Sequence, residues 1–438
     1  MIRSRTRLTC LAVVAVAASL AVSACGAGSR TAAATAAQVD CQFTAPAQPV
    51  SVNVLAYNSS AVDPFTNTMV KSCTRDGVTV NHEPIDFAGQ VQKTTATLAG
   101  ATGTYDILEN YGFVVPTQAA AGKLRPLDDL FAKYTAQYGL DRISPEMRKV
   151  MTYDGKLYAL PMQAQMYVMA YRKDVFDQLG LKPPTTFAEM RDAATKIQAA
   201  GQIKYPIALP LLASSDIITA YDSAMGSLGA NFVDPGSKTP NFDKPQAAQA
   251  FEALRSLLPF MDPQVATFDQ PAVQQQIYNG GAAMAIMFSG RMNDLTQASN
   301  NRFASQMAFA APPSVAGGDI LYNTLSVDGW SIPANTKADP DMLFSIIASS
   351  VGPDSSKASV PAAFPARQGV LTESSSPYAA AALASITKAP PAEPYPWTSV
   401  ISNEIRPVVA DVILGKTSIP DGQAKMQQLA TAVLKQYP

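Results

Sequence analysis

Residues 50–56, Val-Ser-Val-Asn-Val-Leu-Ala, begin an alternation of strand and helix signals that decides the fold class. Their alternating β-branched side chains predict a strand. Asp63-Pro64 then supplies an N-cap and a first-turn proline for the helix that follows. Residues 78–82 predict the next strand, and residues 87–100 predict the next helix. A chain that alternates in this way forms parallel strands joined by right-handed helical crossovers.

The same alternation continues toward the C-terminus. Residues 105–109 and 167–171 predict further strands, and Thr186 caps a strong helical pattern. Residues 282–287 predict a buried strand, and the last third of the chain is mostly helical up to residue 436. No internal repeat is visible. The fold class predicted from these signals is α/β.

The first 24 residues have the pattern of a bacterial lipoprotein signal peptide. Three arginines precede an apolar run over residues 8–22, which is too short to span a bilayer comfortably. The segment Val22-Ser-Ala-Cys25 resembles a lipobox, in which the cysteine is acylated and becomes the new N-terminus. We therefore predict a signal peptide over residues 1–24 and lipidation at Cys25, with an ordinary secretory signal as the alternative. The mature protein would then lie on the outer face of the cytoplasmic membrane.

Residues 25–45 predict a flexible tether, because they are rich in Ala, Thr, Gly and Pro and lack periodicity. Cys41 and Cys73 remain after signal removal and lipidation. In an oxidising compartment they predict a disulfide, with two buried free thiols as the alternative. Because His82 is the single histidine and no close Cys/His spacing occurs, we expect neither a metal nor a cofactor.

The composition excludes several classes of function. Charged residues make up only 15% of the 438 residues, and Lys and Arg are scattered, so the clusters that nucleic-acid binding requires are absent. After the signal peptide no second run of about 20 apolar residues follows, so we expect contact with the lipid bilayer through the acyl anchor alone. The length indicates two domains. We expect a monomer.

Five groups of residues, in order along the chain, resemble motifs of the extracellular solute-binding proteins of ABC transporters. The resemblance is to the sugar-binding family that includes maltose-binding protein. It lies in Asp106-Ile-Leu with Gly122-Lys-Leu-Arg-Pro-Leu127, in Lys156-Leu-Tyr-Ala-Leu-Pro161 with Tyr171-Arg-Lys-Asp-Val-Phe176 and Gly180-Leu-Lys-Pro-Pro-Thr-Thr-Phe187, in Tyr278-Asn-Gly-Gly-Ala-Ala-Met284, in Asp328-Gly-Trp-Ser-Ile-Pro333 and in Ile413-Leu-Gly-Lys-Thr-Ser418.

This resemblance implies a two-lobed periplasmic-binding-protein fold with a cleft between the lobes and three crossover hinge segments. Lobe one would comprise residues 46–167 plus 286–326, and lobe two residues 168–285 plus 327–438. The implied protein is not an enzyme. It would bind a sugar or sugar derivative as the lipoprotein component of an ABC importer, and it would deliver this ligand to the permease.

A sugar site combines aromatic rings, which stack on C–H faces, with planar polar groups that bind hydroxyls. In α/β proteins such groups lie at the carboxyl ends of strands. The strand ends of lobe one offer Tyr57, Asn58, Asp86 with its neighbour Phe87, Glu109, Asn110 and Tyr111. For Asp86 and Glu109 the alternative is a helix cap or a surface ion pair.

The resemblance adds further candidates. It places Gln165, Gly329, Trp330, Arg367 and Trp397 at the cleft, with Trp397 as the stacking platform. Tyr221 and Asp222 would come from a loop of lobe two, and Phe288 would replace a tryptophan that the family often carries. Arg291 would bind a carboxylate or phosphate of the ligand or stack on a ring. For the aromatic residues the alternative is packing in the core. For Arg291 the alternative is a surface position, and for Arg367 it is a structural role.

Two other functions stay open. A binding protein for a peptide, polyamine or phosphorylated polyol would need clustered carboxylates, or Arg and Ser at helix N-termini. A secreted carbohydrate-active enzyme would need two carboxylates about 5–10 Å apart across its substrate. The sequence supplies no motif for either function.

Overall fold

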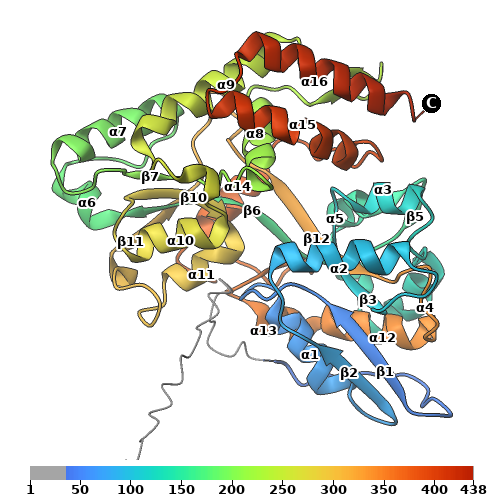
Figure 1. The fold of residues 1–438 in the computed structure, drawn as a ribbon. Helices are drawn as coiled ribbons and strands as arrows, with labels where there is room; N and C mark the ends of the chain where they lie inside the picture. The colour runs from blue at the N-terminus through green and yellow to red at the C-terminus, as the bar shows by residue number, and fades with distance from the viewer. Residues whose placement is uncertain (1–35, 438) are drawn as a thin grey trace, which may run out of the picture.

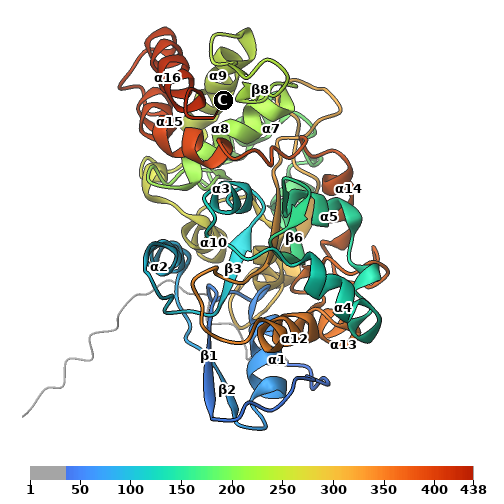
Figure 2. The same ribbon diagram turned by 90° about the vertical axis from the view of Figure 1, so that its right-hand side faces the viewer.

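The computed structural model describes residues 36–437, which form two lobes (Figure 1). The predicted signal peptide and the lipidation site at Cys25 lie outside the described residues. Within these residues, no helix is both long enough and apolar enough to cross a membrane. The long axis of the molecule passes through both lobes, with β1 and β2 at one end and α15 and α16 at the other (Figure 2).

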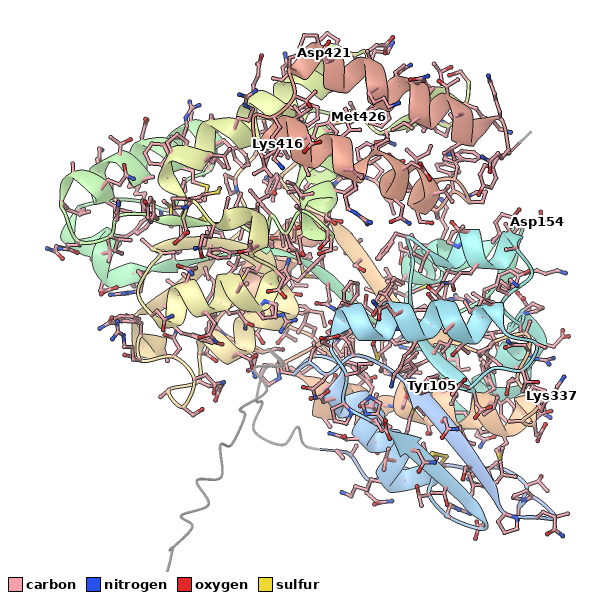
Figure 3. All side chains as sticks on the ribbon, in the orientation of Figure 1. Tyr105, Asp154, Lys337, Lys416, Asp421 and Met426 are labelled. Carbon is pink, nitrogen blue, oxygen red and sulfur yellow. A yellow bond between two sulfur atoms is a disulfide. The ribbon has the colours of Figure 1, made fainter. Side chains whose placement is uncertain are left out.

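The first lobe contains the N-terminal strands and helices and one later excursion of the chain. Its elements are β1 (Val50–Leu55), α1 (Asp63–Cys73), β2 (Val78–His82), α2 (Phe87–Ala99), β3 (Ile107–Tyr111), α3 (Val115–Ala120), α4 (Asp128–Tyr138), α5 (Pro145–Val150), β4 (Thr152–Tyr153), β5 (Lys156–Leu157), β12 (Leu325–Ser331), α12 (Pro340–Ser350) and α13 (Pro353–Ser359). The labelled side chains of Tyr105, Asp154 and Lys337 lie on this lobe (Figure 3).

The second lobe is mostly helical. Its elements are α6 (Lys173–Gln178), α7 (Phe187–Ala199), β7 (Ile207–Ala208), α8 (Asp216–Ser227), β8 (Val233–Asp234), β9 (Thr239–Pro240), α9 (Pro245–Leu257), α10 (Gln270–Tyr278), β10 (Met284–Phe288), α11 (Met292–Leu295), β11 (Met307–Ala310), α14 (Ala379–Thr387), α15 (Thr398–Ile413) and α16 (Ile419–Leu434). Two strands at the lobe junction, β6 (Leu160–Arg172) and β13 (Phe364–Pro365), complete the fold. Short 3₁₀ turns cover Leu140–Arg142, Leu258–Phe260, Val265–Thr267, Ser289–Arg291 and Ala304–Gln306.

One sheet runs through both lobes, in the strand order β2-β1-β3-β12-β6-β10-β7. Strand β1 pairs in parallel with β2 and with β3, as the strand–helix alternation predicts. Strand β12 lies antiparallel between β3 and β6, and β10 lies antiparallel to β6. The α/β class is therefore confirmed, but the sheet as a whole is mixed.

Strand β6 belongs to both lobes. Its first half pairs with β12, while its second half, from Tyr167 onward, pairs with β10. Side chains alternate across the strand. Tyr167 and Met169 enter the core of the second lobe, whereas Met166 and Val168 enter a smaller core beside α14. Every residue of the strand except Tyr171 is buried, including the polar Gln163 and Gln165. The sequence prediction recovered only its second half.

The division of the chain between lobes differs from the prediction in two segments. Residues 327–366 were expected in lobe two, but Val327 and Trp330 pack in the core of the first lobe. Residues 286–326 were expected in lobe one, yet β10 and β11 pair with the second-lobe half of β6. The cause is β12, which returns to the first lobe and inserts between β3 and β6. This pairing depends on contacts that are distant in sequence.

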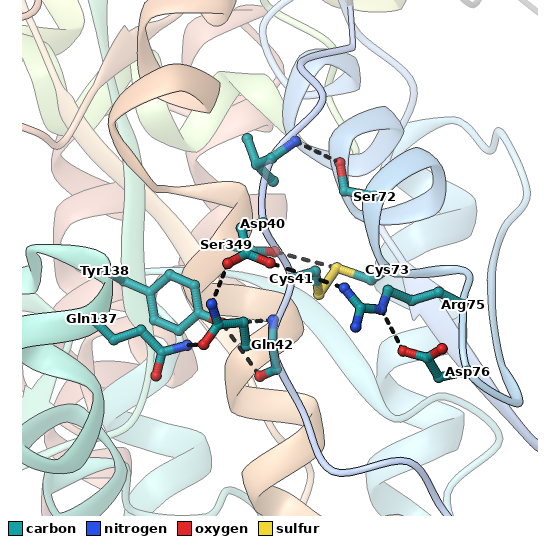
Figure 4. A network of polar contacts seen from close by, with 11 residues as sticks. Asp40, Cys41, Gln42, Ser72, Cys73, Arg75, Asp76, Gln137, Tyr138 and Ser349 are labelled. Carbon is teal, nitrogen blue, oxygen red and sulfur yellow. Dashed lines mark hydrogen bonds and ion pairs between the residues drawn. A yellow bond between two sulfur atoms is a disulfide. The ribbon is translucent and has the colours of Figure 1, made fainter.

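Residues 36–45, predicted as part of the tether, are fixed on the first lobe (Figure 4). The predicted disulfide joins Cys41 to Cys73 at the end of α1. The Val39 N–H also donates a hydrogen bond to Ser72 Oγ at 3.0 Å. A covalent bond and backbone hydrogen bonds therefore bind this segment to α1, and it forms part of the folded lobe.

Candidate ligand-binding site

The loops that follow β1 and β3 lie at the junction of the two lobes. In the loop after β1, Ser60 Oγ donates a hydrogen bond to the Gly290 carbonyl at 3.1 Å. At the start of α3, Thr117 Oγ1 donates to the Pro396 carbonyl at 2.7 Å. Both acceptors belong to the second lobe. The carboxyl ends of β1 and β3 therefore face the other lobe, at the edge where α/β proteins bind ligands.

Four aromatic side chains lie in succession along this edge. The ring centroids are 5.8 Å apart for Tyr57 and Phe87, 5.6 Å for Phe87 and Tyr111, and 5.5 Å for Tyr111 and Phe113. Tyr57 and Tyr111 are nearly buried, but Phe87 is 41% exposed and Phe113 47% exposed. We call this set the aromatic row. Among the described residues, the large hydrophobic side chains that are exposed are these two phenylalanines and Val91, which follows Phe87 by one turn of α2.

A buried carboxylate lies behind the aromatic row. Glu109 is fully buried in the middle of β3, and its Oε2 accepts a hydrogen bond from the Tyr57 N–H at 3.0 Å. Its second oxygen has no hydrogen-bond partner among the described residues. Burial, and next the nearby charge of Asp328, raise the pKa of Glu109 well above its ordinary value. The sequence singled out Glu109 as the end of a strand; in the structure β3 continues to Tyr111, and Glu109 contacts the backbone of Tyr57.

Gln165 on β6 connects the row to a second buried carboxylate. Its Nε2 donates hydrogen bonds to the Tyr57 hydroxyl at 3.0 Å and to Asp328 Oδ2 at 2.6 Å. Gln163 Nε2 also donates to Asp328 Oδ2, at 3.2 Å. Burial raises the pKa of Asp328 to about 6, and these hydrogen bonds oppose the rise. The first-lobe side of the junction thus has exposed rings above a network of amides and carboxyl groups.

The second-lobe side of the junction is formed around Tyr167. The Tyr167 ring lies 4.9 Å from that of Phe288 and 5.8 Å from that of Tyr322. Its hydroxyl is buried and has no hydrogen-bond partner among the described residues. Burial raises the pKa of Tyr167 well above its ordinary value, and the neighbouring Tyr322, Asp216 and Asp222 add to this rise.

Arg291 lies where the second lobe meets the first. It is half-buried, and its backbone carbonyl accepts a hydrogen bond from Gln274 Nε2 at 3.1 Å. Its positive charge acts on two hydroxyls, those of Tyr57 and Tyr278, and opposes the burial that raises the pKa of each. Arg291 is therefore close to the first-lobe network.

The structure brings several of the predicted site residues together at the junction. They are Tyr57, Glu109, Tyr111, Gln165, Phe288 and Arg291. Residues of the junction that the prediction missed are Phe113, Asp216, Tyr167, Tyr322 and Asp328. Phe113 follows a strand end directly, so its position was a usable signal. Asp328 reaches the site only because β12 pairs with β6.

Both tryptophans lie in hydrophobic cores. Trp330 is fully buried in the core of the first lobe. Trp397, predicted as the stacking platform, is 7% exposed, and its ring stacks on Tyr395 at 5.0 Å in the core of the second lobe. Gly329 is a packing residue, since a Cβ there would lie 2.6 Å from the Leu160 carbonyl.

Tyr221 is likewise a core residue, on the second lobe. Its ring stacks on Phe251 at 4.1 Å. Its hydroxyl donates a hydrogen bond to the Ala247 carbonyl at 3.1 Å. Tyr221 therefore shares α8 with Asp222 but points into the helical packing of this lobe.

Arg367 has the structural role that the sequence analysis gave as the alternative to a position at the cleft. Its guanidinium is buried and donates three hydrogen bonds to backbone carbonyls, those of Tyr138 and Gly139 at 2.8 Å and that of Val351 at 3.1 Å. These carbonyls terminate α4 and follow α12. Arg367 therefore holds two helix ends together within the first lobe.

Three further polar candidates have local structural partners. Asp86 caps α2, because its Oδ1 accepts from the Gly89 N–H at 2.7 Å. Asn58 Nδ2 donates to Asp63, and the buried Asn110 donates to Gln118 Oε1 at 2.6 Å. Within residues 36–437, no group of three His, Cys, Asp or Glu side chains could hold a metal ion.

Two α/β lobes that share a sheet, with aromatic and polar side chains where they meet, define the class of two-lobed solute-binding proteins. The model of the family described as "Bacterial extracellular solute-binding protein" matches residues 73–341. This match covers more than half of the chain. The chain therefore belongs to the bacterial extracellular solute-binding protein family, as the sequence motifs predicted.

Curated relatives and a solved structure agree with this assignment. The maltotriose-binding protein of Pyrococcus abyssi is 31% identical over 173 residues, which are 39% of this chain and 34% of that protein. The mannitol-binding protein of Pseudomonas aeruginosa is 27% identical over 256 residues, 56% of each chain. The chain thus matches about a third to about half of the length of these relatives. An ABC transporter solute-binding protein from Agrobacterium vitis, solved with bound D-mannitol, superposes with a TM-score of 0.74 at 24% identity, over 89% of this chain and 99% of that one. The predicted two-lobed fold is confirmed.

Proposed function

We propose that the protein is the extracytoplasmic substrate-binding component of an ABC importer and that it binds a sugar or polyol between its lobes. The observation that carries this proposal is the aromatic row, with Phe87 and Phe113 exposed at the lobe junction. An exposed row of rings is an unusual feature of a soluble surface and indicates a binding site. Rings of this kind stack on the C–H faces of a sugar.

The polar groups beside the row suit hydroxyl ligands. Gln165 offers an amide that can donate and accept, and Glu109 has a carboxyl oxygen without a partner among the described residues. Ligand contact with both sides of the junction would favour a closed arrangement of the lobes, since a ligand shifts the population toward the state that it binds better. No bond of the ligand needs to be broken in this role.

The names of the relatives support the ligand class. The two relatives described above are named for maltotriose and for mannitol, and the solved structure contains D-mannitol. These compounds share several hydroxyl groups and little charge. A neutral polyhydroxylated compound is therefore the first class of ligand to test.

Membrane attachment completes the proposed function. Acylation of Cys25 would anchor the protein to the lipid bilayer on the outer face of the cytoplasmic membrane, and the permease would be its partner there. Confinement near the permease raises the effective concentration for docking. We propose that the protein acts as a monomer.

A thermal-shift titration of the full chain in detergent tests this function. Maltose, maltotriose, mannitol and ribitol would be compared with a tripeptide and with spermidine. A ligand at about 100 times its Kd adds about 2.7 kcal/mol of stability. If only the peptide or spermidine raises the melting temperature, the sugar proposal is wrong. Chemical analysis of the recovered ligand separates binding from catalysis, because a binding protein returns it unchanged.

A further inference from the structure

Helix α3 of the first lobe meets the N-terminal end of α15 of the second lobe (Figure 2). The Thr117 hydroxyl on α3 lies 2.7 Å from the Pro396 carbonyl and 2.7 Å from the Ser399 hydroxyl. Because a carbonyl can only accept, the single proton of Thr117 goes to Pro396, and Ser399 then donates its own proton to Thr117. Two hydrogen bonds through one hydroxyl therefore join the lobes. We call these three residues the α3–α15 contact.

The second-lobe half of the contact is fixed in place. Pro396 lies between Tyr395 and Trp397, whose rings stack at 5.0 Å with their planes 3° apart. Trp397 is the N-cap residue of α15 and packs in the core of the second lobe. The Tyr395 carbonyl also accepts a hydrogen bond from the Thr398 N–H at 3.1 Å. The second lobe therefore holds the Pro396 carbonyl in a defined position without help from the first lobe.

The first-lobe half of the contact is attached to the aromatic row. The exposed Phe113 lies two residues before α3 begins. Helix α3 is held to the carboxyl end of β3 by the hydrogen bond from Asn110 Nδ2 to Gln118 Oε1 at 2.6 Å. Thr117 directly precedes Gln118. A ligand on the aromatic row and the α3–α15 contact therefore act on the same short helix.

The contact lies apart from the strand that the two lobes share. The hydrogen bond from Ser60 to the Gly290 carbonyl is beside that strand, since a Cβ on Gly290 would lie 2.8 Å from Gln165 Oε1 of β6. Helix α15 packs against α8, α9 and α16 and, across the junction, against α3. When lobes rotate about a shared strand, contacts beside the strand can persist, but contacts at a distance from it separate. The α3–α15 contact is therefore one that opening of the lobes breaks.

We propose that Thr117, Pro396 and Ser399 form a latch that must open before the ligand leaves, so that Thr117 sets how long the ligand stays bound. Both hydrogen bonds join neutral groups, and water replaces each partner when the lobes separate. Loss of the Thr117 hydroxyl therefore shifts the balance from closed toward open lobes and leaves each lobe folded. Thr117 is a positioning residue that needs no contact with the ligand. The effect on ligand release rests on the proposed function.

Calorimetry and stopped-flow fluorescence of the full chain in detergent test the latch. The probe is whichever of maltose, maltotriose, mannitol and ribitol binds most tightly. Thr117→Val keeps the shape of the side chain, and we expect it to raise both the Kd and the release rate about five- to tenfold, with little change in the association rate. Thr117→Ser keeps the hydroxyl and should restore slow release. Circular dichroism checks that each variant folds.

A matched control separates the latch from a general effect of losing a hydroxyl. Thr135→Val removes a hydroxyl that donates to the Phe131 carbonyl at 2.6 Å within α4, on the first lobe alone. This variant loses a hydrogen bond of the same kind as Thr117→Val does, but no bond between the lobes. Its Kd and release rate should therefore equal those of the unchanged protein.

A second measurement needs no ligand. Because the Thr117 and Ser399 side-chain oxygens are 2.7 Å apart, cysteines at both positions bring their sulfurs within bonding reach. Under mild oxidation, Thr117→Cys with Ser399→Cys should form a disulfide at least about tenfold faster than Thr117→Cys with Asn403→Cys, an exposed position one turn further along α15. Peptide mapping identifies the new bond. The cross-linked protein should take up the probe much more slowly, and dithiothreitol should restore uptake, with the unchanged protein treated in the same way as the control.

The outcomes separate the latch from the proposed function. If Thr117→Val binds and releases the probe within about twofold of the unchanged protein, the latch is wrong and the proposed function stands. If the two cysteine pairs cross-link equally fast, α3 and α15 do not meet as described, and the latch is also wrong. If the pair at positions 117 and 399 cross-links preferentially but none of the four compounds binds, the contact between the lobes is supported and the proposed function fails.

Discussion

Replacing Arg367 by methionine should destabilise the protein without weakening ligand binding. The guanidinium is 6% exposed and donates hydrogen bonds to the carbonyls of Tyr138, Gly139 and Val351. Methionine keeps most of the apolar stem but leaves three buried carbonyls without their donor. A hydrogen bond to a charged group contributes about 1.5–3 kcal/mol, and solvent or relaxation recovers part of this. We therefore expect Arg367→Met to lower the free energy of unfolding by about 3–5 kcal/mol.

Urea unfolding followed by circular dichroism and tryptophan fluorescence measures this change. Trp330 and Trp397 report on the cores of the first and second lobes respectively. Arg142→Met is the matched control, because Arg142 is exposed in the turn that follows α4, and it should change the free energy by less than about 0.5 kcal/mol. Arg367→Lys should recover only part of the loss, since an ammonium cannot reproduce the planar geometry of the guanidinium.

The opposite result would assign Arg367 to the ligand. Suppose that the free energy of unfolding of Arg367→Met lies within about 1 kcal/mol of that of the unchanged protein, while the variant binds a sugar or polyol much more weakly. The hydrogen bonds to the three carbonyls would then contribute little to stability. The reasoning from burial and hydrogen bonding would then be refuted, and Arg367 would be a binding residue.

Three other changes test the remaining features. Removing the disulfide with Cys41→Ala and Cys73→Ala should cost about 3–4 kcal/mol, because the bond joins residues 32 positions apart; a reductant should lower the melting temperature of the unchanged protein but not of this variant. Asp328→Asn should flatten the pH dependence of unfolding. Because the pKa of Asp328 is raised from 3.8 to about 6 in the folded state, that state binds more protons than the unfolded state between these pH values. The stability of the unchanged protein therefore falls as pH rises through this range. Urea unfolding at pH 4, 5, 6 and 7 measures how the free energy of unfolding changes with pH. We expect part of this pH dependence to remain in the variant, because the pKa of Glu109 is also raised. Phe113→Ala should weaken sugar or polyol binding by about 5–20-fold and leave unfolding within about 0.5 kcal/mol; an unchanged affinity in calorimetry would exclude Phe113 from the site.

The N-terminal half of the first lobe was predictable because its signals are local. Helix α1 begins at Asp63, one residue earlier than an Asp63 N-cap predicts, because Val62 takes the N-cap position without a side-chain hydrogen bond. The strand over residues 50–56 matches β1 to within one residue. Each of these elements has its own periodicity, cap or proline. The parallel pairing of β1 with its neighbours follows from the helices between them.

Features that depend on distant contacts could not be predicted. The position of Trp397 is determined by Tyr395, Tyr437 and Lys238, which pack against or lie over its ring. A large aromatic residue near the end of the chain is equally compatible with a core and with a binding site. The residue type alone therefore did not indicate whether the Trp397 side chain faces the core or a binding site.

The candidate site was predictable on one side only. In the first lobe, Tyr57 follows the end of β1 and Tyr111 ends β3, and a parallel sheet brings such positions to one edge. In the second lobe the contributing residues come from a helix and from irregular segments.

Strand β6 has a consequence for how the two lobes unfold. Its 13 residues form hydrogen bonds with β12 toward the first lobe and with β10 and β11 toward the second. Loss of structure in either lobe removes ladder partners from a strand that the other lobe needs. The lobes should therefore melt as one cooperative unit, with a single calorimetric transition. The amide protons of β6 should exchange with solvent only through global unfolding.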